Sequence, residues 1–172
     1  MHPEVALLRQ VKGVGPLISL TFVLTLDDPQ RFRRSRDVGC FLGLRPGRRN
    51  SGRSEPQLHI SKEGDRYLRT LLVQGAHYIL GPLGEDSDLR RWGLKLAQRG
   101  GKNAKKRAVV ALARKLAVLL HKLWVSEEVY EPLRNNRLCD TFSPYSISAR
   151  TVSCVVPCRT ASARLNTAPS HH

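Results

Sequence analysis

With 172 residues, 41% of them hydrophobic, the chain has room for one domain and enough apolar side chains to bury a core. Its 29 Lys and Arg residues outnumber 14 Asp and Glu residues and leave a formal net charge of +15. This excess favours nucleic acid as the partner over an anionic membrane surface or an acidic protein, because bound cations release the counterions of a polyanion.

Membrane insertion and secretion are not expected. No stretch reaches the roughly 18 consecutive apolar residues that indicate a membrane span. The first ten residues lack the basic region that precedes the apolar part of a secretion signal. We therefore expect a cytoplasmic protein with no membrane partner.

The first predicted elements are two short helices joined by a glycine hairpin, over about residues 5–26. Pro16 suits the first turn of the second helix, where its missing N–H costs nothing. The turn resembles that of a helix-hairpin-helix motif, which presents backbone N–H groups to phosphate, so Gly13 and Gly15 are candidate DNA-binding positions that a Cβ would obstruct. An ordinary helical hairpin is the alternative. Helical spacing comes from Val5, Leu8 and Val11 before the turn and from Leu17, Leu20, Val23 and Leu24 after it.

A turn at Asp28-Pro29 leads into a basic segment around Phe32, which is either a solvated face or a contact for a nucleic-acid backbone. The next segment, residues 45–58, is an irregular loop that contains RPGRRNSGRSEPQ. Ser51 lies among its arginines. The loop is either a solvated connection or the site of a nucleophile held among phosphate-binding guanidinium groups.

Three further helices are expected. One begins near Gly64, the next is capped by Asp86 or Ser87, and the longest covers the sequence AKKRAVVALARKLAVLLHKLWVSEEVY. The predicted apolar faces are Tyr67, Leu68, Leu71, Leu72 and Ala76 in the first, and Val109, Leu112, Ala113, Leu116, Leu119, Leu120 and Leu123 in the longest.

The fold class that follows is a small, mainly α domain over residues 1–135, with strand content limited to the QLHI segment. Residues 136–172 are rich in Ser, Thr, Pro and Cys without a sustained period, and we expect a disordered or out-of-frame tail. The cysteine spacings fit neither a zinc site nor a disulfide framework. We expect no metal site in this chain.

Six motifs in order indicate a family. They are VKGVGP at 11–16, DPQRF at 28–32, GLRP at 43–46, SG at 51–52, ISKEGDRYLR at 60–69 and VALARKL at 110–116. Over about residues 8–130 the chain resembles the C-terminal domain of bacterial insertion-sequence transposases that pair a DEDD nuclease domain with a serine domain. Bridge-RNA-guided recombinases belong to this group, and the Piv invertase is a relative.

The resemblance implies that Ser51 is the nucleophile for DNA cleavage and rejoining, with Ser54 as the reserve because Asn50 stands where relatives often carry a second serine. The candidate phosphate-binding residues around it are Arg45, Arg48, Arg49, Arg53, Lys62, Arg66 and Arg69. The resemblance further implies Mg²⁺ bound by a DEDD domain that is not in this sequence. We therefore expect a truncated or separately encoded half of an enzyme that is inactive alone.

The partners implied are DNA, a guide RNA, the DEDD domain in cis or in trans, and further copies in a homo-oligomer associated with the nucleoid. Two other functions are possible. One is a non-catalytic helix-hairpin-helix module that binds nucleic acid, and the other is a domain that dimerises through the apolar stripe of residues 109–123.

Overall fold

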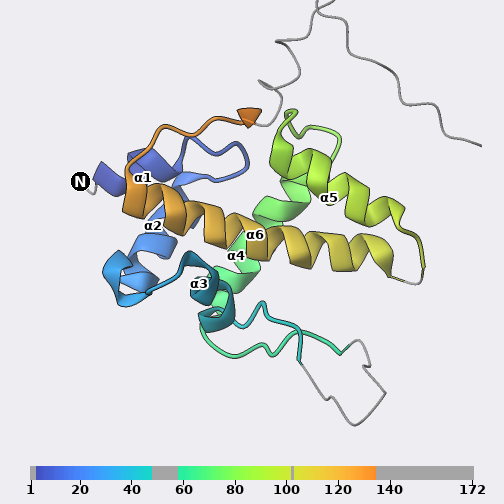
Figure 1. Ribbon diagram of the computed structural model, residues 1–172, viewed down its shortest axis with the longest axis horizontal. Coiled ribbons are helices and arrows are strands. Elements are labelled where there is room, and N and C mark those ends of the chain that lie inside the picture. The colour runs from blue at the N-terminus through green and yellow to red at the C-terminus, as the bar shows by residue number, and fades with distance from the viewer. Residues whose placement is uncertain (1–2, 48–57, 102, 135–172) are drawn as a thin grey trace, which may run out of the picture. The chain divides into compact units, whose positions relative to one another are not determined.

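The computed structural model describes residues 3–47, 58–101 and 103–134, and Figure 1 shows their arrangement. The mainly α fold class is confirmed for these ranges, in which an isolated bridge between Pro46 and Ile60 is the one β interaction. The helices are α1 (Pro3–Leu8), α2 (Pro16–Leu26), the 3-10 helix η1 (Pro29–Arg31), α3 (Ser35–Phe41), α4 (Arg66–Leu80), α5 (Asp88–Gln98) and α6 (Ala104–Ser126). Residues 136–172, the expected tail, lie outside the described ranges.

Helix α6 is the centre of the domain, and α1, α3, α4, α5 and η1 all pack against it (Figure 1). Its predicted apolar face is confirmed with one exception, since Leu119 is only partly buried. Leu112, Leu116 and Leu120 are fully buried in the core of the domain itself. The alternative in which this stripe forms a dimer seam is therefore wrong, because these side chains are already covered.

Local signals place the starts of several helices. Pro16 occupies the first turn of α2, as expected. Asp65 caps α4 by accepting a hydrogen bond from the backbone N–H of Leu68 at 2.5 Å. Ser87, rather than Asp86, caps α5. Each cap supplies an acceptor for an N–H group that has no partner inside the helix.

One predicted helix face is wrong in part, and in α2 most of the residues that indicated helical spacing are not in the core. In α2 the buried side chains include Ile18, Phe22 and Leu26, whereas three of the four residues that indicated helical spacing are exposed. These exposed residues are Leu17, Leu20 and Leu24. In α4, Tyr67 is 56% exposed, although Leu68, Leu71, Leu72 and Ala76 are buried as predicted. An aromatic ring at the edge of an apolar face can lie in solvent because its neighbours already fill the core.

The segment between α2 and α3 is fixed to the C-terminal half of α6. His121 is buried, and its Nε2 donates a hydrogen bond of 2.9 Å to the carbonyl oxygen of Pro29. The Phe32 ring packs edge-on against His121, with ring centroids 5.7 Å apart. Phe22 of α2 also meets Trp124 at 6.4 Å between centroids, so α2 lies at the C-terminal end of α6.

Candidate nucleic-acid interface

The ends of the loop at residues 45–58 are joined by backbone hydrogen bonds. The N–H of Gly47 donates to the carbonyl of His59 at 2.9 Å, and that of Ser61 donates to Arg45 at 2.9 Å. A third bond joins the N–H of Lys62 to the carbonyl of Gly43 at 3.1 Å. Residues 43–47 and 59–64 thus form a closed neck at the base of the loop. The expected strand in QLHI is reduced to the single bridge at Ile60.

Two glycines make this neck possible. Gly43 and Gly64 both have positive φ, +67° and +78°, which disfavours any side chain. A Cβ on Gly43 would overlap the backbone of Glu63, and a Cβ on Gly64 would overlap the carbonyl oxygen of Phe41. The end of α3 and the turn before α4 therefore touch backbone to backbone, at a distance that only glycine permits.

Arg69 reinforces the same contact from α4. Its Nη1 donates to the carbonyl oxygen of Leu42 at 3.1 Å and to that of Glu63 at 3.0 Å. These two carbonyls lie on opposite sides of the neck, so one guanidinium group ties the sides together. We predicted Arg69 as a phosphate ligand; its guanidinium group has this structural role, and it is only partly exposed.

The structure brings several predicted cations to the neck. Arg45, Lys62 and Arg66 are exposed there, two of them on the neck itself and one in the first turn of α4. Lys62 has a left-handed backbone, with φ of +60°. The remaining predicted site residues, Ser51, Arg48, Arg49, Arg53 and the reserve Ser54, lie outside the described residues. In the sequence they lie between the two segments of the neck, residues 43–47 and 59–64.

The two hairpin glycines differ. Gly13 has φ of +95°, and a Cβ there would meet Cγ1 of Ile79 at 2.7 Å. Gly15 has φ of −83° and ψ of 175°, ordinary extended backbone, and open space around a Cβ. The prediction that a Cβ on Gly15 would obstruct the turn is therefore wrong. Gly15 is instead the N-cap of α2, without a side-chain hydrogen bond to the first turn.

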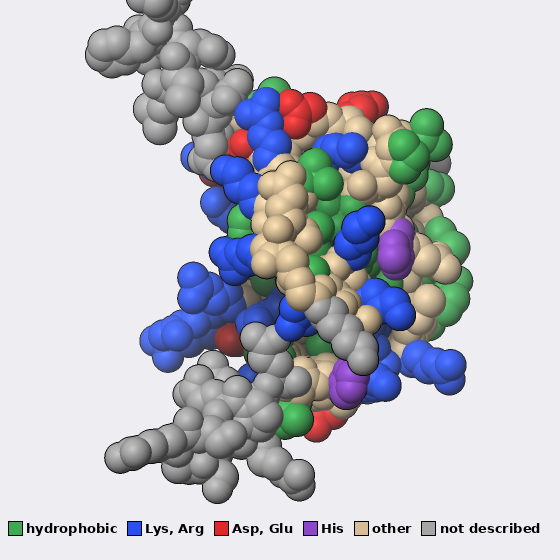
Figure 2. Space-filling view, turned by 90° about the vertical axis from the view of Figure 1, so that its right-hand side faces the viewer, with side chains coloured by type: hydrophobic (Ala, Val, Ile, Leu, Met, Phe, Trp, Pro, Cys, Tyr) green, Lys and Arg blue, Asp and Glu red, His purple; other side chains and the backbone are tan. Residues whose placement is uncertain are grey.

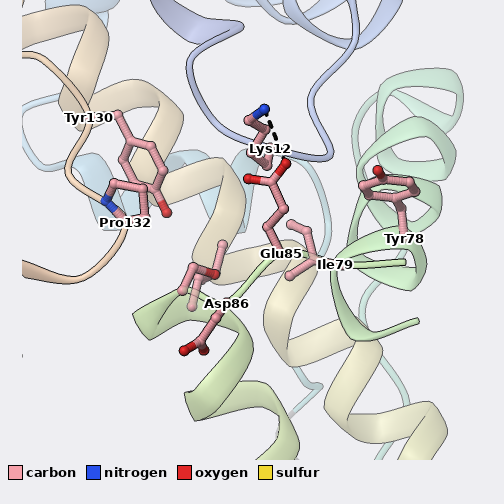
Figure 3. Close-up of a pocket in the computed structure, with 10 residues that line it drawn as sticks. Lys12, Tyr78, Ile79, Glu85, Asp86, Tyr130 and Pro132 are labelled. Atoms are coloured by element: carbon pink, nitrogen blue, oxygen red, sulfur yellow. Dashed lines mark ion pairs between the residues drawn. The ribbon is translucent and has the colours of Figure 1, made fainter. Parts of the chain in front are cut away.

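The hairpin between α1 and α2 contacts the turn that follows α4. Lys12 forms an ion pair with Glu85, with 3.1 Å between Nζ and Oε1, and Figure 3 shows this pair beside Tyr78 and Ile79. The enclosed space at this point is about 20 Å³, enough for one water molecule and too small for a substrate. The ion pair is exposed to solvent, and the hairpin meets α4 itself where Gly13 lies against Tyr78 and Ile79.

A further set of cations was not among the predicted site residues. Figure 2 shows Lys and Arg side chains gathered on the face that carries the α5–α6 connection, with few acidic groups. A stretch of basic residues around GGKN was the available signal in the sequence. We name this surface the α5–α6 basic patch; its exposed cations are Lys95, Arg99, Lys105, Lys106 and Arg107.

Two other cations are held by aromatic rings. Arg31 lies over the rings of Phe32 and Phe41, with its Cζ 5.9 and 5.2 Å from their centroids. Lys115 Nζ lies 4.2 Å from the centroid of Trp92. Burial lowers the pKa of Lys115, because desolvation disfavours its charged form. In both contacts the side chain packs against an aromatic ring, and this packing fixes the position of its charged group.

The described ranges contain no cluster of three or more His, Cys, Asp or Glu side chains that could hold a metal ion. None of the helices in the same ranges combines the length and the apolar character needed to cross a membrane.

Comparisons with known proteins cover the same segments. Residues 5–86, which include the hairpin and the whole neck, match the family described as Transposase IS116/IS110/IS902. The transposase for insertion sequence element IS1111A of Coxiella burnetii is 39% identical over 123 residues, 71% of this chain and 33% of that protein. A probable family 20 transposase of Pseudomonas aeruginosa is 36% identical over 126 residues, 73% of this chain and 36% of that protein.

The transposase for insertion sequence element IS1328 of Yersinia enterocolitica is 33% identical over 111 residues, 64% of this chain and 32% of that protein. The chain thus spans about a third of the length of the curated relatives it matches. As the ordered motifs indicate, residues 5–86 of this chain belong to the IS116/IS110/IS902 family of transposases.

Proposed function

We propose that this chain is the part of a transposase that binds DNA and carries the nucleophilic serine, Ser51. The observation that carries the proposal is the closed neck below the serine loop. A solvated connection needs neither the close backbone contacts at Gly43 and Gly64 nor the two hydrogen bonds from Arg69. A loop that must present one hydroxyl group at a fixed position needs both, because catalytic geometry tolerates little displacement.

DNA binding is supported by the distribution of charge. Three exposed cations surround the neck, Arg45, Lys62 and Arg66, and the α5–α6 basic patch adds five more. Cations on flexible side chains address phosphates, which are the same at every base pair. The proposed binding is therefore strong at low salt and has little sequence preference.

The proposed reaction conserves the number of phosphodiester bonds. The Oγ of Ser51 attacks a backbone phosphorus atom, a new P–O bond forms, and the bond from phosphorus to one deoxyribose oxygen breaks. The serine loses its proton and the leaving oxygen gains one. A hydroxyl group of another DNA end can then displace the serine, which rejoins the strand without a high-energy cofactor. The arginines of the loop would offset the charge that develops on the phosphate.

Other components of the proposal come from the resemblance. It implies a DEDD domain with bound Mg²⁺, a guide RNA and a homo-oligomeric enzyme. The resemblance places that metal in the DEDD domain, and the described residues of this chain do not include a carboxylate cluster. We propose that the chain needs this domain, in cis or in trans, to cleave DNA.

A chimera tests the assignment of the serine. The segment of the Coxiella relative that matches this chain would be replaced by the corresponding residues of this chain, and DNA cleavage would be followed by denaturing gels. We expect a covalent protein–DNA adduct that maps to Ser51 and disappears in Ser51→Ala. Ser54→Ala and Ser61→Ala are matched controls that should retain it. An adduct that survives Ser51→Ala would refute the role of this residue.

The second candidate is a non-catalytic nucleic-acid-binding module, which the α5–α6 basic patch favours because it does not depend on the loop. Under this alternative the chimera binds DNA with normal affinity and forms no adduct at any serine. Substituting two cations of the patch, Lys105→Gln and Lys106→Gln, would then remove most of the measured binding, whereas changes at Arg45 and Arg66 would have little effect.

A further inference from the structure

A third set of cations lies along helix α3, which leads from the basic segment RFRRSR at 31–36 into the neck (Figure 1). Arg33, Arg34 and Arg36 are all exposed. Within the described ranges none of the three forms an ion pair, although Asp37 follows directly in the chain. Three positive charges are therefore left without a counter-charge from the domain itself.

Aromatic packing holds this segment in place. The Phe32 ring packs edge-on against Phe41, with centroids 5.3 Å apart, and also against His121. The guanidinium group of Arg31 lies over the rings of Phe32 and Phe41. Because the backbone around Phe32 is fixed, a ligand that binds the neighbouring arginines has to order only their side chains, which reduces the entropy lost on binding.

Tertiary packing adds a cation from α6 to the same helix. The side chain of Arg114 lies across α3 at Gly39, where a Cβ would be 2.9 Å from its Cγ and 3.2 Å from its Nε. Arg36 and Gly39 are three residues apart, so they share one side of α3. Arg114 has neither an ion pair nor a hydrogen bond with any residue that the structure describes. Glycine at position 39 thus lets α6 place a guanidinium group on the side of α3 that carries Arg36.

The row of cations ends at the neck. Gly43 follows the end of α3, and its carbonyl oxygen accepts the hydrogen bond from the N–H of Lys62 at 3.1 Å. Arg36 precedes Gly43 by seven residues, which corresponds to about 10 Å at the rise of an α-helix. One strand of duplex DNA advances about 3.4 Å per base pair, so this distance covers about three base pairs.

We propose that the α3 surface binds the phosphate backbone of duplex DNA and continues the contact made at the neck. Its cations are Arg33, Arg34, Arg36 and Arg114. A guanidinium group suits this ligand because it can donate two parallel N–H bonds to phosphate oxygens. The inference rests on the proposed DNA binding and adds the path of the duplex across the domain. Continuity with the neck favours DNA over the part of the longer relatives that this chain lacks, because the serine loop must itself reach a DNA backbone.

Fluorescence anisotropy of the full chain with a labelled DNA duplex, over a range of salt, tests the proposal. Arg36→Gln combined with Arg114→Gln removes two phosphate contacts, each worth about 0.9 in the log–log salt slope, so the slope should change from roughly −5 to roughly −3. At about 0.1 M salt the affinity should fall by roughly sixtyfold, with about 1 M as the limit at which counterion release contributes nothing.

The matched control removes the same charge from another surface. Lys122 and Arg134 are exposed and line a groove that also contains Glu128 and Glu131, so the net charge around them is small. Lys122→Gln combined with Arg134→Gln should leave the salt slope nearly unchanged. If this pair weakens binding as much as the α3 pair does, only the net charge matters and the α3 surface is not a contact.

A second test pair is Arg33→Gln with Arg34→Gln, which changes only exposed side chains, and circular dichroism with thermal unfolding shows that each protein is folded. If both test pairs bind DNA as tightly as the unsubstituted chain, the inference is wrong although the proposed DNA binding stands. A loss seen with an RNA duplex of the same sequence but not with DNA would also overturn it. If the unsubstituted chain binds no DNA at all, the proposed DNA binding is refuted and the α3 contact with it.

Discussion

Replacing Gly64 with alanine tests whether the neck is a close backbone contact. The new Cβ would overlap the carbonyl oxygen of Phe41 at a residue whose φ is +78°. Positive φ alone costs a non-glycine residue about 1–2 kcal/mol. Relieving the overlap would also separate the neck and lose three backbone hydrogen bonds, each worth about 1 kcal/mol net. We therefore expect Gly64→Ala to lower the free energy of unfolding by roughly 3–5 kcal/mol.

Gly100→Ala is the matched control for this change. Gly100 has nearly the same φ, +75°, but nothing lies within 4 Å of a Cβ built there. It should therefore lose only the conformational part, about 1–2 kcal/mol. Denaturant unfolding measures both losses, and hydrogen exchange at the N–H groups of Ser61 and Lys62 shows whether the neck opens. If the two variants lose the same stability, the close contact inferred between Gly64 and Phe41 does not exist in solution.

Three other predictions follow from the observed contacts. DNA binding should fall with a log–log salt slope of roughly −5 if about six phosphates are contacted, and a fluorescence titration that stays flat between low and physiological salt would contradict it. Gly15→Ala should leave thermal stability nearly unchanged while Gly13→Ala lowers it, because only Gly13 has positive φ and a crowded Cβ position; equal melting temperatures would be inconsistent with the structure. Burial raises the pKa of Tyr130, so stability should fall as pH rises from about 10 through that raised value, where the unfolded state loses the proton first. Denaturant unfolding across that range should show a smaller decline for Tyr130→Phe, and an identical decline would rule out the contribution of Tyr130.

The sequence by itself determined the helical fold class, most helix starts and the family. Helix starts depend on contacts between residues at most three positions apart, so a short stretch of sequence is enough to predict them. This holds for Pro16 in α2, Asp65 in α4 and Ser87 in α5. The buried face of α6 was also predictable, because polar and apolar residues separate around that helix. The ordered motifs identified the family because each is a short contiguous string.

Tertiary structure decided the rest. Helix α2 is apolar on every side, so no periodicity could show that Leu20 faces outward while Phe22 faces the core. Gly64 lies against the backbone of Phe41, which is 23 residues away in the chain, and this contact depends on the packing of α3 and α4 on α6. Arg69 could be recognised as a cation but not as a clamp, because its two carbonyl partners come together only in the closed neck. Contacts of this kind depend on long-range packing, which a local sequence pattern does not encode.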